Sequence, residues 1–494
     1  MTLLANKAVP VPKGWNIVPT GQIYKIVGGG TPSTSVDDYW NGNIPWITSA
    51  DIQGLKDIRH RKFVTQKGVQ NSTTTLVPQG SIIVVTRVGL GKIGLAKQDI
   101  CFSQDCQGLI CNNSIVFPDY ALYFLSTAVQ SFKYESRGTT ISGVTKKQLT
   151  ELPFKLPPLP EQKRIVAKIE ELFTRLDAGV EGLKKVKAEL KRYRQAVLKC
   201  AFEGKLTADW RKKNKDKLEP ASKLLERIAK EREKQTKGKA KKPPMLDKSE
   251  LPEVPEGWEW ARLADITDMS SGKAFKKKEY AIKGVRLFQI ANVSFGNTLW
   301  ENIAYLPESY LETQSKLALR VGNVIMALNR PILNGELKIC VLRKDDVPAI
   351  LYQRVGRFDF YADKVSPFFF YYARSPLFLK QLRISLQGVD QPFVNKPKLL
   401  SIIIPLTSLV EQLAIVQEIE RHFSITDEVE QTIEKSLKEA DRLRQSILKK
   451  AFEGKLVPQD PADLPAAELL KQIIEEKRKR EKSPQSRQVK AKHK

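Results

Sequence analysis

Hydrophobic residues recur at alternating steps of three and four positions in two long segments of the chain. In the first segment these positions are Ile169, Leu172, Leu176, Leu183, Val186, Leu190, Tyr193 and Val197, with Gly179 in the one weak position. In the second they are Ile419, Val429, Ile433, Leu443 and Ile447, with His422, Thr426, Ser436 and Ala440 in the remaining positions. This spacing, held for about four heptads, predicts a coiled-coil helix in each segment. We interpret His422 as a packed histidine of the seam and not as a metal ligand.

The two segments are copies of each other at an offset of 250 residues. Between residues 161 and 206, 21 of 46 positions are identical to the residue 250 positions later, without a gap. A duplication of this size predicts two-fold symmetry inside one chain. Two copies of one helix pair most economically as antiparallel partners, which would form a rigid spacer roughly 65 Å long. The alternative is two unrelated surface helices in separate domains.

Strand patterns replace the helical ones in the segments that precede each long helix. Apolar runs at 81–86 and 323–328, each after a glycine, predict buried strands, and Asn334-Gly335 predicts a hairpin. Residues 120–132 and 368–382 have helical patterns. After the long helices, Gly204 and Gly454 are placed as helix C-caps, and each is followed by a shorter helical segment, around 224–228 and 469–473.

We therefore predict an α+β fold in which two strand-rich mixed domains are separated by two long antiparallel coiled-coil helices with pseudo-twofold symmetry. The predicted boundaries are residues 1–156 (module 1), 157–252 (a long helix and a basic linker), 253–404 (module 2) and 405–494 (a long helix and a basic tail). The helical regions match each other well, whereas the modules share little beyond their hydrophobic pattern.

The charge of the chain indicates a polyanionic partner. The formal net charge is +27, and residues 1–156 alone carry 16 basic against 9 acidic residues. The excess is therefore not confined to the basic segments 211–243 and 471–494, which are either solvated or in contact with phosphates. Nucleic acid is the polyanion that we expect. No apolar run is long enough to span a membrane, and residues 1–7 do not resemble a signal peptide, so we expect a cytoplasmic protein.

The sequence offers no catalytic constellation. The five cysteines include no C-x-x-C pair and there are three histidines, so we expect buried thiols, no metal site and no histidine base. Residues 89–94 match G-x-G-x-x-G, but no helical pattern follows, which argues against a dinucleotide site. Glu336-Leu337-Lys338 resembles the end of a nuclease motif by chance. The chain has neither a phosphate-binding loop nor an Asn-Pro-Pro-aromatic or Asp-Pro-Pro-Tyr segment typical of amino-methyltransferases.

Polar loops of both modules carry side chains suited to DNA. Arginine suits guanine, asparagine and glutamine suit adenine, and lysine suits phosphate. The DNA-binding candidates of module 1 are Arg87, Lys92, Arg137, Thr139, Thr140 and Lys146. Those of module 2 are Lys273, Lys276, Lys277, Asn329, Arg330, Gln387, Asp390 and Gln391. For any one of them, an ordinary surface loop is the alternative.

Over essentially its whole length the chain resembles the specificity subunit of type I restriction-modification enzymes. The motifs that carry this resemblance are Pro157-Pro158-Leu159-Pro160-Glu161-Gln162, Arg194-Gln195-Ala196-Val197-Leu198, Phe202-Glu203-Gly204-Lys205-Leu206, their second copies, and the module openings Pro12-Lys13-Gly14-Trp15 and Pro255-Glu256-Gly257-Trp258. The second Pro-Pro-Leu is degraded, since its counterpart Pro405-Leu406-Thr407-Ser408-Leu409 keeps one proline and the leucine.

The resemblance implies a non-catalytic subunit that binds no cofactor and recognises a bipartite, asymmetric double-stranded DNA target. It also implies two methyltransferase subunits and motor-nuclease subunits as partners, which would bind S-adenosylmethionine, ATP and magnesium. Two alternatives from other classes are a DNA methyltransferase with a fused recognition domain and a coiled-coil adaptor that binds no DNA.

Overall fold

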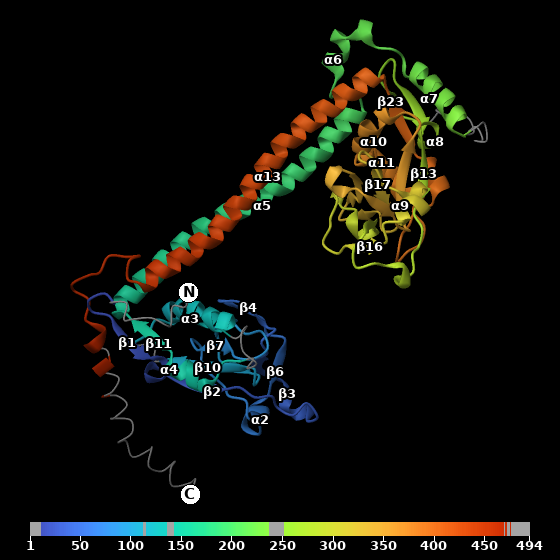
Figure 1. Ribbon diagram of the computed structural model, residues 1–494. Helices are drawn as coiled ribbons and strands as arrows, with labels where there is room; N and C mark the ends of the chain where they lie inside the picture. The colour runs from blue at the N-terminus through green and yellow to red at the C-terminus, as the bar shows by residue number, and fades with distance from the viewer. Residues whose placement is uncertain are drawn as a thin grey trace. The chain divides into compact units, whose positions relative to one another are not determined.

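The computed structural model of the protein (Figure 1) describes residues 11–111, 115–135, 143–236 and 251–468, together with 470, 471 and 475. By its internal contacts the chain divides into two compact units, residues 1–183 with 435–494 (unit 1) and residues 184–434 (unit 2). Among the described helices, none combines the length and the apolar character needed to cross a membrane.

Both predicted long helices are present. They are α5 (Leu159–Phe202) and α13 (Leu409–Phe452), each of 44 residues. In unit 2 the Lys187 ammonium lies 2.8 Å from the Glu434 carboxylate, and in unit 1 Arg444 is paired with Asp177. Residue numbers rise along one helix as they fall along the other. The helices are therefore antiparallel within each unit, as the repeat predicted, and each contributes one half to each unit.

Most of the predicted seam is buried or half-buried, but five of its positions are exposed, one of which is the weak position Gly179. Val186, Tyr193, Val429 and Leu443 are 41%, 44%, 37% and 51% exposed. Because a pair of helices covers only a narrow stripe of each partner, seam positions toward its edge keep contact with solvent. His422 lies at this edge. It is half-buried, its Nδ1 is 2.7 Å from the Tyr193 hydroxyl, and its ring packs against the Tyr193 ring, so it is a packed histidine at the edge of the seam and not at its centre.

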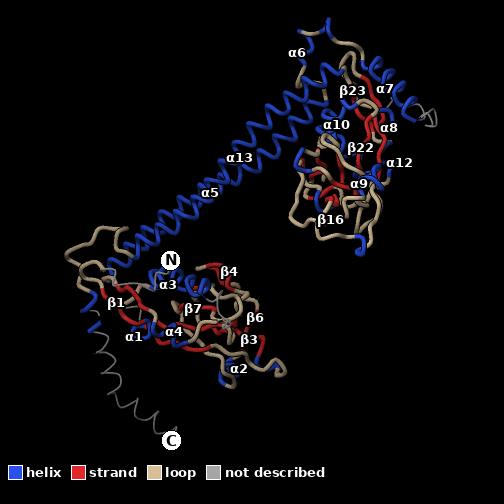
Figure 2. Tube along the Cα trace, in the orientation of Figure 1, coloured by secondary structure: helices blue, strands red, loops and turns tan. Residues whose placement is uncertain are grey.

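Module 1 contains a four-stranded antiparallel sheet in the order β2-β10-β7-β8, a three-stranded sheet β6-β3-β9 and a two-stranded pair β1-β11 (Figure 2). The strands are β1 (Asn16–Pro19), β2 (Tyr24–Gly28), β3 (Trp40–Ile47), β4 (Ile52–Gly54), β5 (Asp57–Ile58), β6 (Lys62–Val64), β7 (Ile82–Val85), β8 (Ile93–Leu95), β9 (Cys101–Phe102), β10 (Cys106–Cys111) and β11 (Pro153–Leu156). The helices are α1 (Thr20–Ile23), α2 (Gln66–Gln70), α3 (Pro118–Glu135) and α4 (Lys146–Glu151).

Module 2 repeats this plan with the sheets β13-β22-β17-β20-β15, β16-β14-β21 and β12-β23, to which a β18-β19 hairpin is added. The strands are β12 (Glu259–Arg262), β13 (Thr267–Ser271), β14 (Val285–Phe288), β15 (Phe295–Gly296), β16 (Ala304–Leu306), β17 (Val324–Ala327), β18 (Ile332–Leu333), β19 (Glu336–Leu337), β20 (Ile339–Val341), β21 (Ala349–Leu351), β22 (Val355–Phe360) and β23 (Ile403–Leu406). The helices of unit 2, besides its parts of α5 and α13, are α6 (Ala208–Lys213), α7 (Ala221–Thr236), α8 (Leu263–Ile266), α9 (Tyr310–Thr313), α10 (Ser366–Ala373), α11 (Pro376–Ser385) and α12 (Lys396–Leu400).

The predicted strands, the hairpin and the helical segments of the modules are confirmed. The apolar runs form β7 and β17, and Asn334-Gly335 closes the β18-β19 hairpin with positive φ at both residues. The segment 368–382 is helical as predicted, and it is divided into the two helices α10 and α11. Ser375 caps a new helix there, and Pro376, which lacks a backbone N–H, cannot continue the one before it. The segment 224–228 lies in α7, whereas 469–473 falls largely outside the described residues.

The last residue of each long helix is inserted into the core of a module. The Phe202 ring at the end of α5 lies 5.1 Å from the Phe368 ring in unit 2. Its repeat partner Phe452, at the end of α13, lies 5.2 Å from Phe124 in unit 1. α5 follows module 1 in the sequence but ends in the core of module 2. α13 follows module 2 but ends in the core of module 1. The antiparallel pairing of the two copies requires this exchange.

A buried carboxylate joins the start of α13 to the opening of module 2. Glu411 is 1% exposed and accepts hydrogen bonds from the Trp258 indole (2.9 Å), Arg211 Nε (2.7 Å) and the hydroxyls of Thr207 (2.9 Å) and Thr407 (2.6 Å). Two repeated motifs thus meet, since Trp258 ends Pro-Xaa-Gly-Trp and Glu411 begins Glu-Gln. Four donors saturate the acceptor positions of this carboxylate.

Candidate nucleic-acid interface

Three segments of module 2 leave its main sheet at the same end. The C-terminal residue of β13, Ser271, is paired with Gly356, and that of β17, Ala327, is paired with Val355 at the start of β22. The segments 272–278, 328–331 and 352–354 therefore begin or end side by side. They carry the predicted residues Lys273, Asn329 and Arg330.

The segment 386–394 is hydrogen-bonded to the same sheet end. The Arg330 backbone N–H donates to Pro392 O at 2.7 Å, and the Arg330 guanidinium donates to Asp390 O at 3.3 Å. The Val394 N–H donates to Leu328 O at 3.0 Å. The structure thereby brings together predicted residues that lie far apart in the sequence. We call this surface the loop face of module 2: Lys273, Asn329, Arg330, Arg354, Gln387, Asp390 and Gln391.

Arg354 belongs to the loop face but is not among the DNA-binding residues predicted from the sequence. Its backbone O accepts from Leu328 N–H at 2.9 Å, and its side chain is exposed. It has a positive φ of 64°, which is uncommon outside glycine. Neither a motif nor a glycine marks this position. Only the pairing of β22 with β17 reveals that it lies beside Asn329.

Lys276 and Lys277 lie further along the segment that follows β13. Both are exposed, and the Lys276 N–H donates to the Glu279 carboxylate at 2.6 Å. This hydrogen bond lowers the pKa of Glu279 and holds the turn that carries the two lysines. The Tyr310 hydroxyl also donates to Glu279, which ties the turn to α9 instead of to the loop face.

Module 1 has the same arrangement of strand ends. Gly28 at the end of β2 is paired with Gln107, and Val85 at the end of β7 is paired with Cys106 at the start of β10. The hydrogen bonds Thr86 N–H to Asp105 O and Val144 N–H to Thr86 O, both 2.8 Å, match those that Leu328 makes with Arg354 and Val394. Asp105 thus occupies the position of Arg354. The two faces share a backbone plan but differ in charge.

The predicted residues of module 1 are placed less completely. Arg87 is exposed directly after β7, and Lys92 donates from Nζ to Ser49 O at 3.0 Å at the far side of the same loop. Lys146 is exposed in the first turn of α4, which Thr145 caps. Arg137, Thr139 and Thr140 lie outside the described residues.

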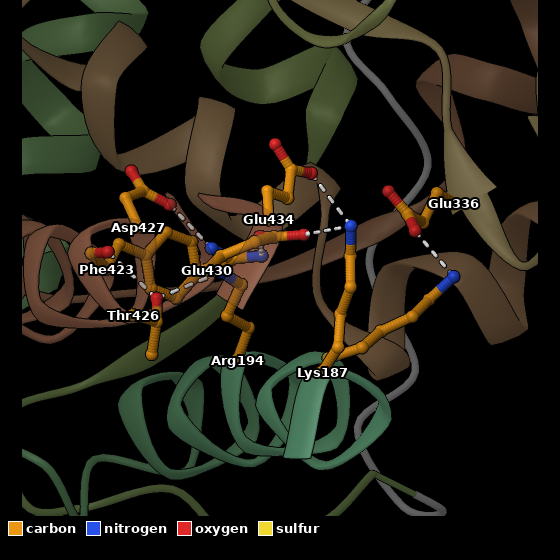
Figure 3. Close-up of polar contacts among 9 residues, drawn as sticks. Lys187, Arg194, Glu336, Phe423, Thr426, Asp427, Glu430 and Glu434 are labelled. Carbon is orange, nitrogen blue, oxygen red and sulfur yellow. Dashed lines mark hydrogen bonds and ion pairs between the residues drawn. The ribbon is translucent and has the colours of Figure 1, made fainter. Parts of the chain in front are cut away.

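Charged side chains link the two helices in unit 2 (Figure 3). Arg194 donates to the Thr426 hydroxyl at 3.0 Å, to Asp427 at 2.6 Å and to Glu430 at 2.8 Å. In unit 1 the repeat partners of Arg194 and Asp427, which are Arg444 and Asp177, form the corresponding ion pair. The same contact is thus made twice, once in each unit.

A family model described as the type I restriction modification DNA specificity domain matches the chain twice, over residues 12–192 and 255–439. Each match contains most of one module and a large part of the long helix that follows it. The chain belongs to the type I restriction-modification DNA specificity family. The resemblance seen in the repeated motifs is therefore confirmed.

Two relatives in this specificity family match nearly the whole chain. The MjaVIII specificity subunit of Methanocaldococcus jannaschii is 31% identical over 450 residues, which cover 90% of this chain and 94% of the relative. The EcoDI specificity subunit of Escherichia coli is 25% identical over 479 residues, which cover 94% and 96%. Both are named as specificity subunits of type I restriction enzymes.

Solved structures show the fold of the specificity family. A chain from a structure of the complex assembly and conformational transition of the type I R-M system has a TM-score of 0.65 at 18% identity, covering 90% of this chain and 99% of that chain. The HsdS subunit from Thermoanaerobacter tengcongensis has a TM-score of 0.51 at 18% identity, covering 91% and 99%. The predicted α+β fold with a pair of long helices is confirmed.

The motifs that imitate catalytic sites have structural explanations in this member of the specificity family. The G-x-G-x-x-G segment turns back into β8, so it is a hairpin without the helix that a dinucleotide site requires. Glu336 forms an ion pair of 2.5 Å with Lys191 of α5, and Lys338 donates to Ile290 O. Burial lowers the pKa of Lys338.

The cysteines of this specificity-family chain are unpaired thiols. Cys101, Cys106 and Cys340 are buried, and Cys111 and Cys200 are half-buried. Burial raises the pKa of the Cys101 thiol to about 11 and that of Cys106 to about 12. Such thiols stay protonated at neutral pH. Within the described residues, no three His, Cys, Asp or Glu side chains are grouped so as to hold a metal ion.

Proposed function

We propose that this chain is the DNA-sequence-specificity subunit of a type I restriction-modification enzyme and is itself non-catalytic. In this proposal the loop faces of the two modules bind the two halves of a bipartite, asymmetric double-stranded DNA target. The observation that carries the proposal is a pattern of backbone hydrogen bonds that is repeated at the sheet ends of the two modules. The side chains at the corresponding positions differ between the modules. Faces with one backbone plan and different side chains suit half-sites of different sequence.

The partners that we propose are double-stranded DNA, two methyltransferase subunits and motor-nuclease subunits. The chain would direct the methyltransferases to methylate an adenine in the target and the motor-nucleases to cleave unmodified DNA. S-adenosylmethionine, ATP and magnesium would be bound by these partners. Support comes from the family membership and from the name that the relatives carry.

We also propose that residues 1–156 and 253–404 act as the two recognition domains, and that the helical regions within 157–252 and 405–494 set the gap between the half-sites. The antiparallel pair, in which the Arg–Asp ion pair is made twice, supports the second part of this proposal. Two helices joined along a seam resist bending more than one helix does. A defined gap requires such stiffness.

An exchange of one module tests the proposal. The full chain is reconstituted with its methyltransferase subunits, and residues 253–404 are replaced by the corresponding segment of a relative with another target. Methylated adenines are then mapped by single-molecule sequencing. We expect one half-site to change while the other half-site and the gap stay the same, and the exchange of residues 1–156 should change the other half-site. Methylation without sequence preference by the unmodified complex, or methyl transfer by the chain alone, would contradict the proposal.

A further inference from the structure

A valine lies at the tip of the loop that contributes Gln387, Asp390 and Gln391 to the loop face of module 2. Val389 is 96% exposed, although valine is among the residues most often found buried. Its neighbours Asp390 and Gln391 are exposed and polar. We propose that Val389 contacts the C5 methyl group of a thymine in the major groove of the DNA target. This inference rests on the proposed function and adds to it the kind of base that one side chain recognises.

The loop that carries Val389 is held in one conformation by its backbone. Gln387 and Phe393 exchange two hydrogen bonds of 2.8 and 2.9 Å, so residues 388–392 form a closed loop between them. Arg330 binds this loop at two carbonyls, those of Asp390 and Pro392. The backbone of such a loop is held in place before it binds. Little conformational entropy is then lost on contact.

The surroundings of Val389 select the kind of partner. Arg330, Arg354 and Lys273 give the loop face positive charges, which attract the phosphate backbone. The contacted surface must then offer one apolar group among hydrogen-bonding groups. In DNA the thymine methyl is that group, since it lies in the major groove beside the thymine O4 and the adenine N6 and N7. Gln391 and Arg330 can bind these polar edges next to it. The minor groove presents no methyl group.

The sequence repeat supports a role for a methyl-bearing side chain at this position. The residue 250 positions before Val389 is Thr139, which also carries a methyl group on a branched Cβ. Thr139 lies outside the described residues, so the correspondence is one of sequence alone. It indicates that Val389→Thr is the most conservative exchange for testing this position.

Deoxyuridine, which is thymine without its methyl group, provides the test. After the target is mapped, each thymine on both strands is replaced singly by deoxyuridine, and binding of the full chain with its methyltransferase subunits is measured. We expect one position at which the replacement weakens binding about fourfold, the effect of one buried methyl group. Val389→Ala should weaken binding to thymine DNA by a similar factor and abolish the difference between thymine and deoxyuridine at that position. Val389→Thr, which keeps one methyl group, should retain part of the difference.

Val321→Ala is the matched control. Val321 is also an exposed valine (54%) of module 2, but it precedes β17, at the opposite end of that strand from Asn329. This variant should keep the full deoxyuridine effect. The inference is wrong if no position responds to deoxyuridine, or if Val389→Ala leaves the response intact. A change in DNA bending without a deoxyuridine effect would indicate a wedge between bases and would also overturn it. If the unmodified complex shows no sequence preference at all, the proposed function fails instead.

Discussion

Arg330 joins two segments of the loop face of module 2. It has a positive φ of 45°, and both its backbone N–H and its guanidinium bind the loop at 386–394. A non-glycine residue in this backbone region is strained, and the strain persists only where surrounding contacts hold it. The exposed guanidinium therefore has a defined position, as base recognition requires. Lys277, by contrast, is exposed on a turn outside the loop face.

This contrast predicts different losses for two cationic residues. Arg330→Ala should weaken binding to the target by about 1–3 kcal/mol and relax the base preference at one position, because a guanidinium can bind guanine with two hydrogen bonds. Lys277→Ala should weaken binding to all sequences alike and reduce the slope of log K against log salt by about one. Binding isotherms at several salt concentrations, on target and random DNA, measure both effects. If Arg330→Ala weakened binding to target DNA and to random DNA by the same factor, Arg330 would contact only phosphate.

A second prediction concerns the buried Glu411. Glu411→Ala leaves the Arg211 guanidinium, which is 18% exposed, without its 2.7 Å partner. Removal of one partner of a buried ion pair costs about 3–5 kcal/mol. We expect chemical denaturation to show unit 2 destabilised by this amount. The control is Glu428→Ala, an exposed glutamate of the same helix, which should change stability by less than about 0.5 kcal/mol. Equal stability of the two variants would contradict a structural role for Glu411.

At the scale of elements, the two long helices and their ends repeat one set of contacts. The Arg194–Asp427 pair is open to solvent on one side, since the aspartate side chain is 63% exposed and the arginine side chain is 22% exposed. Such a pair contributes less than about 1 kcal/mol. Its recurrence as Arg444–Asp177 indicates that these charges select the antiparallel register and add little to stability. The helix ends contribute more, because Phe202 and Phe452 are buried among aromatic rings.

Gly204 and Gly257 lie near the end of α5 and differ in what an added Cβ would contact. Gly204 has a φ of +68°, and a Cβ there would lie 2.4 Å from Pro255 Cγ. Gly257 has a φ of +84° with no atom within 4 Å of such a Cβ. Gly257→Ala should therefore cost only the strain of about 1–2 kcal/mol. Gly204→Ala should cost more, since it also separates the helix end from the opening of module 2. Thermal unfolding measures both, and a smaller loss for Gly204→Ala would contradict the packing described.

At the scale of the whole molecule, the proposed gap depends on helix length. Removal of residues 180–186 together with 435–441 deletes one heptad from each helix and keeps the Asp177–Arg444 and Lys187–Glu434 contacts. The pair becomes about 10 Å shorter, which corresponds to about three base pairs. We expect methylation mapping to show both half-sites unchanged and the gap shortened by that number. Deletion from α5 alone should disrupt the pairing. A gap that stays the same after the double deletion would show that the helices do not set it.

The sequence was most informative where a feature depends on near neighbours or on a copy of itself. The heptads predicted α5 and α13, since helix pairing requires apolar residues every three or four positions. Gly204 and Asn334-Gly335 predicted a cap and a turn because these backbone conformations favour few residue types. The helical pattern at 368–382 also depends on near neighbours, and Pro376 divides it into two helices. At the candidate site, the sequence named the loops with Arg330 and Gln387 separately, and the structure brings them together at one sheet end.

By itself, the sequence determined the duplication, the helices, their antiparallel pairing and the family, because each is encoded in periodic or repeated residues. Only the tertiary structure decided that Arg330 and Asp390 are in contact, that Arg354 lies beside Asn329, and that Phe202 ends in the core of module 2. These contacts join residues that are distant in sequence, and they follow from strand pairing and helix packing. Local patterns contain no information about which strand ends lie side by side. The exposed position of Val389 is likewise a result of the fold, since in the sequence it is one valine among polar neighbours.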